Sequence, residues 1–141
     1  MSAGTVLAFD YGERYVGVAV GEGGVSVAHP LQTIETKDAA ARLAAIAALV
    51  AEWQPERLVV GLPLRLEGER HALTRRAERF ARQLEARFHL PVTLVDERLS
   101  SVEAEGRLAA IGRGGRRHKR LAHPVSAQVI LQDYFDRHAA A

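Results

Sequence analysis

Two acidic motifs follow short apolar segments of the chain. Asp10 comes directly after residues 5–9 (TVLAF), and Asp96-Glu97 comes after residues 92–95 (VTLV). A carboxylate at the end of a buried strand is costly to desolvate unless it is paired, hydrogen-bonded or bound to a metal ion. Two carboxylates at one edge of a sheet can hold Mg²⁺ or Mn²⁺, and these ions activate water for phosphodiester hydrolysis. Asp10 and Glu97 are therefore candidate metal ligands of a nuclease.

Both motifs also have a structural interpretation. Asp10-Tyr11-Gly12 is typical of a turn where a strand enters a hairpin, and its spacing alone favours turn and ligand equally. Asp96-Glu97 can cap the helix that follows, although Ser100 and Glu103 already form a capping box there.

A basic segment lies near the end of the chain, where no acid occurs between Glu105 and Asp133. Its glycines predict a mobile loop, which is either a solvated surface or a phosphate-binding edge. We favour the second interpretation because arginine binds phosphate through a planar fork of donors. The candidate nucleic-acid contacts are Arg98, Arg113, Arg116, Arg117, Lys119 and Arg120.

The pattern of apolar residues predicts five strands and four helices. Strands are expected at residues 5–10, 15–20, 25–28, 58–61 and 92–95. Helices are expected after Asp38, over residues 73–88, after Ser100, and from Pro124 to about residue 136. The first three strands have short connections and predict an antiparallel meander. The later strands alternate with helices, which requires parallel pairing and right-handed crossovers.

The expected fold class is α/β, with a mixed five-stranded sheet and helices on both faces. The first strand can lie beside the fourth, with the fifth next, so that Asp10 and Glu97 meet at one edge. We expect one domain over residues 1–138 and a short tail at 139–141, because 141 residues suit a single core.

Composition narrows the classes of function. The chain has no cysteine, which excludes disulfides, thiol nucleophiles and cysteine-ligated metals. Its longest apolar stretch is interrupted by Arg42 and is too short to cross a bilayer. The first ten residues lack the basic region of a signal peptide, so we expect a cytoplasmic protein without membrane contact.

Several motifs of the chain together resemble the YqgF family, whose members are known as pre-16S rRNA nucleases and as Holliday junction resolvases. The resemblance covers nearly the whole chain and implies a ribonuclease H-like fold. The motifs that carry it are Leu7–Gly12 (LAFDYG), Gly17–Val20 (GVAV), Val59–Leu64 (VVGLPL), Asp96–Ala104 (DERLSSVEA), Ser126-Ala127 and Ile130–Phe135 (ILQDYF).

The resemblance implies acidic site residues at Asp10 and Glu97, but the position of the family's third acid holds His123. Imidazole can ligate softer divalent ions, so His123 as a ligand predicts that Mn²⁺ is preferred and Mg²⁺ is possible. The alternative is that His123 only caps the helix that begins at Pro124.

The leading hypothesis is a metal-dependent nuclease that cleaves RNA, namely the precursor of 16S rRNA at its 5′ end. The residues favour a nuclease, and the RNA substrate is implied by the resemblance. One alternative is a nuclease specific for DNA junctions, which needs a homodimer to cut two strands symmetrically, whereas an RNA nuclease can act as a monomer. A non-catalytic RNA-binding factor of ribosome assembly is another alternative. An actin-like ATPase is disfavoured because the chain is too short for two lobes.

Overall fold

The computed structural model describes residues 4–62, 72–96 and 115–138, with side chains in the last range from residue 123 onward. Five strands form one sheet in the order β3-β2-β1-β4-β5. They are β1 (Thr5–Asp10), β2 (Tyr15–Glu22), β3 (Val27–Glu35), β4 (Arg57–Leu62) and β5 (Val92–Asp96). The first three pair antiparallel, and β1, β4 and β5 run parallel, so the predicted mixed sheet is confirmed.

The third strand was predicted at the wrong place. It spans Val27–Glu35 instead of residues 25–28, and β2 continues to Glu22. Ser26 has a left-handed backbone (φ 60°) and its amide donates to the Glu22 carbonyl at 2.8 Å, which closes the turn there. The alternating VSVA sequence therefore contains a turn followed by the start of a strand.

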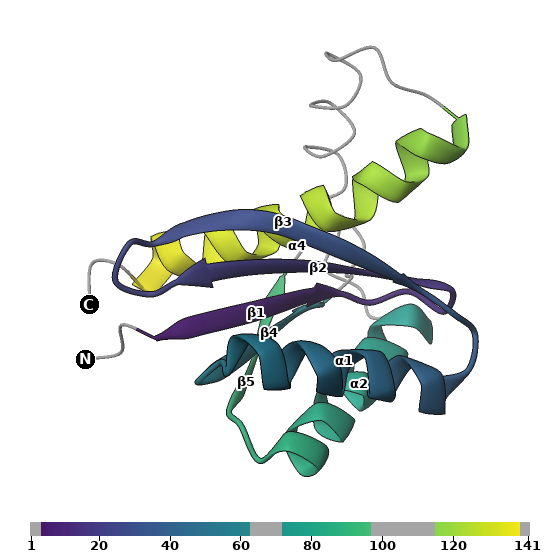
Figure 1. Ribbon diagram of the computed structural model, residues 1–141, viewed down its shortest axis with the longest axis horizontal. Helices are drawn as coiled ribbons and strands as arrows, with labels where there is room; N and C mark the ends of the chain where they lie inside the picture. Colours follow the sequence, from purple (N-terminus) through teal and green to yellow (C-terminus); the bar gives the residue numbers. More distant parts are fainter. Residues whose placement is uncertain (1–3, 63–71, 97–114, 139–141) are drawn as a thin grey trace.

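Helices cover both faces of the sheet, as predicted (Figure 1). One face carries α1 (Ala39–Trp53) and α2 (Ala72–Phe88), and the other carries α4 (Gly115–His138). The predicted cap of α1 is confirmed, because the Asp38 side chain accepts from the Ala40 amide at 3.3 Å. The helix expected after Ser100 lies outside the described residues.

The expected loop in the basic segment is wrong from Gly115 onward. The last helix begins at Gly115 instead of Pro124, so Pro124 lies inside it. A proline within a helix removes one backbone donor, which this helix tolerates, and the glycines before it were a misleading signal for a loop. The basic positions 116–120 are consequently helical.

The two faces of the sheet are packed by side chains of different size. Under α1 and α2 the strands present large residues such as Leu7, Phe9 and Val18, which pack against Ile46 and Phe80. The strand residues that pack against α4 include three alanines, together with Val6, Val59 and Val95. These alanines are Ala8, Ala19 and Ala28.

Two glycines and two glutamines fix α4 on the sheet. A Cβ at Gly17 would overlap the backbone carbonyl of His123, and one at Gly21 would lie 2.6 Å from the Phe135 ring. Gln132 accepts from the Ala28 amide and donates to the Ser26 carbonyl, both at 3.0 Å. Gln128 donates to the Ala28 carbonyl at 3.1 Å. The helix therefore lies close to β2 and is held along the edge strand β3.

Candidate functional site

Asp10 lies at the carboxyl end of β1, on the face of the sheet that α4 covers. Side chains alternate along a strand, and Val6 and Ala8 both pack toward α4, so Asp10 points to the same face. Its cross-strand neighbour is Gly17 of β2. The side chain is partly exposed, as a ligand-binding carboxylate needs to be.

His123 lies over this same place. Its backbone carbonyl packs against Gly17, the residue paired with Asp10. Its ring stacks on Tyr15, with 5.0 Å between ring centroids and 13° between planes. The structure therefore brings Asp10 and His123 to one corner. It also shows that the interpretation of His123 as a helix cap is wrong, because the residue lies well inside α4.

The environment of His123 favours a neutral imidazole. The residue is partly buried, and desolvation lowers its pKa from the usual 6.5 because burial disfavours the charged form. A metal ligand must be the neutral ring with a free lone pair. The electrostatics of this corner thus suit ligation.

The carboxyl end of β5 lies at the same edge of the sheet as Asp10. In the parallel register Phe9 pairs with Val60, Gly61 with Val95, and Leu62 with Asp96. The expectation that the first and fifth strands end together is confirmed for the described residues. Glu97 itself lies outside them. Val95 packs toward α4, so by alternation Asp96 faces away from Asp10's side of the sheet.

The described residues alone do not form a complete metal centre. Within residues 4–62, 72–96 and 115–138, no three His, Cys, Asp or Glu side chains gather around one possible ion position. Asp10 and His123 are thus the two site residues that this part of the chain places in one corner.

The predicted nucleic-acid contacts fall partly outside the described residues, where Arg98 and Arg113 lie. Four further basic residues occupy the first turns of α4, which Figure 1 shows extending beyond the sheet. They are Arg116, Arg117, Lys119 and Arg120.

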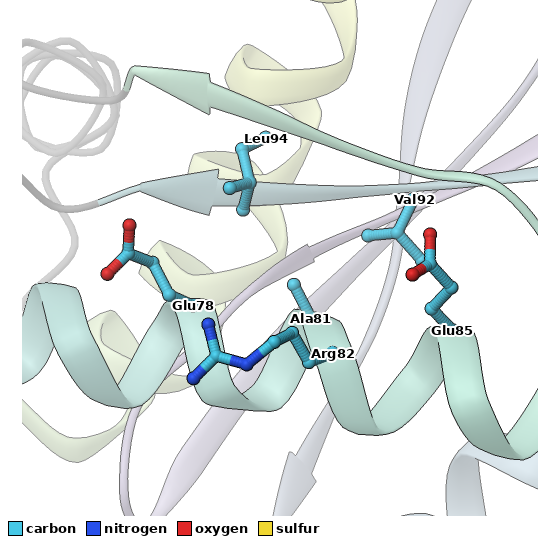
Figure 2. A pocket seen from close by; sticks show the side chains of 6 residues that line it. All are labelled: Glu78, Ala81, Arg82, Glu85, Val92 and Leu94. Atoms are coloured by element: carbon cyan, nitrogen blue, oxygen red, sulfur yellow. The ribbon is translucent and has the colours of Figure 1, made fainter.

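A small hollow lies on the other face of the sheet, between α2 and β5 (Figure 2). It has a volume of about 150 Å³ and is lined by Glu78, Ala81, Arg82, Glu85, Val92 and Leu94. Because Val92 and Leu94 alternate with Val95, this hollow opens away from the Asp10 corner. It is therefore separate from the candidate site.

Sequence reasoning missed two residues of the corner. Tyr15 supports the His123 ring, and Gly17 allows the helix backbone to approach. A glycine inside a strand is a known signal of close backbone approach, so Gly17 carried a usable signal. The partner of Tyr15 could not be found, because it comes from a helix more than 100 residues away in the sequence.

The comparisons with known proteins agree with this architecture. Residues 4–137 match the family described as "RuvX: Holliday junction resolvase". A relative from Methylobacillus flagellatus is 56% identical over 96% of this chain and 92% of its own length. Another, from Dechloromonas aromatica, is 53% identical over 94% of this chain and 91% of its own. Both carry the name "Putative pre-16S rRNA nuclease".

A solved structure shares the fold. It is titled "T. thermophilus RuvC in complex with Holliday junction substrate", with a TM-score of 0.62, 21% identity and coverage of 96% of both chains. In the part of the chain that the structure describes, no helix has the length and apolarity needed to cross a membrane. The predicted family is confirmed: the chain belongs to the RuvX family of nucleases, enzymes that hydrolyse phosphodiester bonds of nucleic acids.

Proposed function

We propose that this protein is a divalent-metal-dependent nuclease that cleaves precursor 16S rRNA during maturation of its 5′ end in the cytoplasm. The observation that carries the proposal is the corner where Asp10 ends β1 and α4 places His123 over the paired Gly17. The RNA substrate is supported by the names of the relatives. The protein would act as a monomer or as a homodimer.

Asp10, His123 and Glu97 are the residues that would hold the metal. A carboxylate oxygen and a neutral imidazole nitrogen are both donors for divalent ions. Glu97 directly follows β5, which ends at the same edge of the sheet as β1. When bound, the metal activates water and stabilises charge on the phosphate.

His123 makes Mn²⁺ the preferred ion. Mg²⁺ binds hard oxygen ligands, whereas Mn²⁺ also accepts nitrogen. The stack on Tyr15 restrains the imidazole ring, and burial keeps the ring neutral by lowering its pKa. This arrangement supplies an oriented nitrogen donor where relatives of this family are expected to carry an acid.

The basic positions of α4 form the proposed contact with the RNA backbone. Helical spacing puts positions 116, 119 and 120 on the same face as position 123, seven, four and three residues before it. Arg116, Lys119 and Arg120 therefore occupy one face of the helix, the face that also carries His123. Arg117, Arg98 and Arg113 complete the proposed set. Such contacts position the backbone and do not read sequence.

The test is cleavage of four labelled substrates in parallel by the full chain. The substrates are an RNA that spans the 5′ end of 16S rRNA, an unrelated single-stranded RNA, a single-stranded DNA and a four-way DNA junction. Each is incubated with Mn²⁺, Mg²⁺ or EDTA, and Asp10→Asn serves as the inactive control. Cleavage of the precursor RNA that requires metal and Asp10 supports the proposal. Cleavage that persists in EDTA contradicts it.

A junction resolvase is the second candidate, because the matching family is described by that activity. This function needs a homodimer that cuts two strands symmetrically. Cleavage restricted to the four-way junction, by a protein that sediments as a dimer, would favour it. Tight RNA binding without cleavage in any metal would instead favour a non-catalytic assembly factor.

A further inference from the structure

Arg42 is an unusual residue for its position. It lies in the first turn of α1, and only 8% of it is exposed, which makes it the one charged residue among the described residues that is buried. Burying a guanidinium costs free energy, and its Nε atom is buried with no hydrogen-bond partner in the described part of the chain. A buried charge of this kind is expected to have a specific structural or functional role.

The guanidinium ties together two connections of the fold. Its Nη2 atom donates to the carbonyl of Glu13 at 2.7 Å and to the carbonyl of Thr36 at 3.3 Å. Glu13 belongs to the turn between β1 and β2, and Thr36 to the link between β3 and α1. The Thr36 amide also donates to the Arg14 carbonyl at 2.9 Å. Arg42 thus anchors the turn to the helix.

Arg42 also holds the residue directly after Asp10. Its guanidinium carbon lies 5.5 Å from the centre of the Tyr11 ring, within the range of a cation–π interaction. The Tyr11 ring packs against Phe80 of α2 with 4.8 Å between centroids. Alternation puts Asp10 on one face of the sheet and Tyr11 on the other. The backbone next to Asp10 is therefore held by contacts on the face of the sheet opposite to the Asp10 carboxylate.

We propose that Arg42 is a positioning residue. It fixes the turn at residues 11–14 and thereby the carboxylate of Asp10, which directly precedes this turn in the sequence. The inference rests on the proposed function, since it assigns Arg42 to the same site. Arginine suits this place because one guanidinium nitrogen donates to both carbonyls while the flat group lies near the Tyr11 ring, and an ammonium group has no flat face to stack. A misplaced catalytic group loses rate even when the fold is intact.

The test compares Arg42→Lys with Arg57→Lys. Arg57 is a matched control at the amino end of β4, the end of the strand away from Asp10. Its Nη1 atom donates to the Thr93 hydroxyl at 2.8 Å. For Arg42→Lys we expect kcat to fall about 10- to 100-fold with KM for RNA within about twofold. We expect Mn²⁺ affinity, measured by calorimetry, to fall about 10-fold, and amide exchange to accelerate at residues 11–15. Arg57→Lys should leave all four quantities unchanged.

The readouts separate this inference from the proposed function. If the wild-type protein cleaves no RNA, the proposed function fails. The amide-exchange rates and the Mn²⁺ affinity then still decide the role of Arg42. The inference is overturned if folded Arg42→Lys keeps wild-type kcat and Mn²⁺ affinity. It is also overturned if exchange accelerates throughout α1 with a lower melting temperature and an unchanged kcat, because Arg42 would then be only structural.

Discussion

The two faces of the sheet differ in how closely their helices approach. Under α1 and α2, large side chains such as Phe9 and Phe80 fill the space, with 6.0 Å between these ring centroids. Under α4, the backbone of the helix touches the strand itself at Gly17, which has no side chain, and the nearby Ala8 and Ala19 on that face are small. The first face is an apolar layer of large side chains, and the second combines an apolar layer with a close backbone contact at Gly17.

We therefore expect the face under α1 and α2 to contribute mainly to stability, and the face under α4 to position the candidate site. The layer under α1 and α2 excludes water from large apolar side chains, and such burial drives folding. The close contact at Gly17 brings the backbone of α4 to the end of β1, so His123 lies over the residue that pairs with Asp10 although 113 positions separate the two in the sequence. Substitutions at the close-contact face, the face that α4 covers, should therefore affect the site.

The largest effect is expected for Asp10→Asn. The substitution keeps the size of the side chain and removes the charge that would bind the metal, so cleavage should fall on the order of 10³-fold. The melting temperature should change little, because Asp10 lies at the end of its strand. Single-turnover cleavage with saturating Mn²⁺ measures the loss. Asp136→Asn is the control, since this exposed acid lies near the other end of α4. Wild-type activity in Asp10→Asn would exclude Asp10 from the site.

Gly17→Ala and Gly21→Ala test the close contact at its two ends. Both alanines would overlap their neighbours, and each should lower the free energy of unfolding by about 1–3 kcal/mol. At Gly17 the added Cβ meets the His123 backbone and displaces it from Asp10, so cleavage should fall about 100-fold. At Gly21 it meets Phe135 and the Val27 carbonyl, away from the site, so the folded protein should retain its activity.

These two variants need a common measurement of folding. Urea denaturation gives the free energy of unfolding, and cleavage is assayed where both variants are more than nine-tenths folded. Equal activity in the two variants would break the link between the close-contact face and catalysis.

The sheet was more predictable from the sequence than the corner that it supports. Apolar runs marked β1, β4 and β5, and their parallel arrangement followed from the helices between them. The motif match gave the place of His123, but nothing local in the sequence indicated that Pro124 lies inside a helix. The glycines before Pro124 suggested a loop, whereas the structure has helix from Gly115 onward.

Buried polar contacts were also beyond sequence reasoning. Arg42 only interrupted an apolar stretch, and its partners are backbone carbonyls, which have no signature in the sequence. The glutamines that hold α4 on β3 are similar, since Gln132 binds backbone atoms of residues more than 100 positions away. Such contacts depend on the assembled fold and need coordinates to be seen.

His123→Asp tests which metal the close-contact face selects. An aspartate would supply a hard oxygen and one more negative charge, so Mg²⁺-supported cleavage should rise about 10-fold. His123→Ala should lower activity with either ion. Titrations of Mn²⁺ and Mg²⁺ against cleavage rate measure the preference of each variant. Equal activity of the wild type in both metals, unaltered by either substitution, would remove His123 from the ligand set.

A smaller effect is expected from the helix that leads to this corner. Arg116→Gln with Arg117→Gln should weaken RNA binding a few-fold. The slope of log affinity against log salt should decrease in magnitude by about 1.4. Each phosphate contact on a single strand contributes about 0.7 to this slope, and two contacts are removed. Filter binding from low to high salt measures the slope. The control replaces Arg82 and Arg87 of α2, which are exposed on the opposite layer. The same flattening in both double variants would show a non-specific effect of net charge.

The smallest effect is a dependence of stability on pH that belongs to His123 alone. Burial lowers its pKa below 6.5, so the unfolded chain takes up a proton before the folded protein does. The free energy of unfolding should therefore fall as the pH decreases from about 6.5 through the lowered pKa, and this contribution should be constant above and below that range. His123→Asn cannot titrate, so its stability should lack this decrease. Urea denaturation at a series of pH values from about 7.5 to about 5 compares the two proteins, and the difference between their curves isolates His123 from the other groups. Parallel curves would mean that the imidazole is equally solvated in both states, and the close-contact face would then not desolvate the residue that it brings to Asp10.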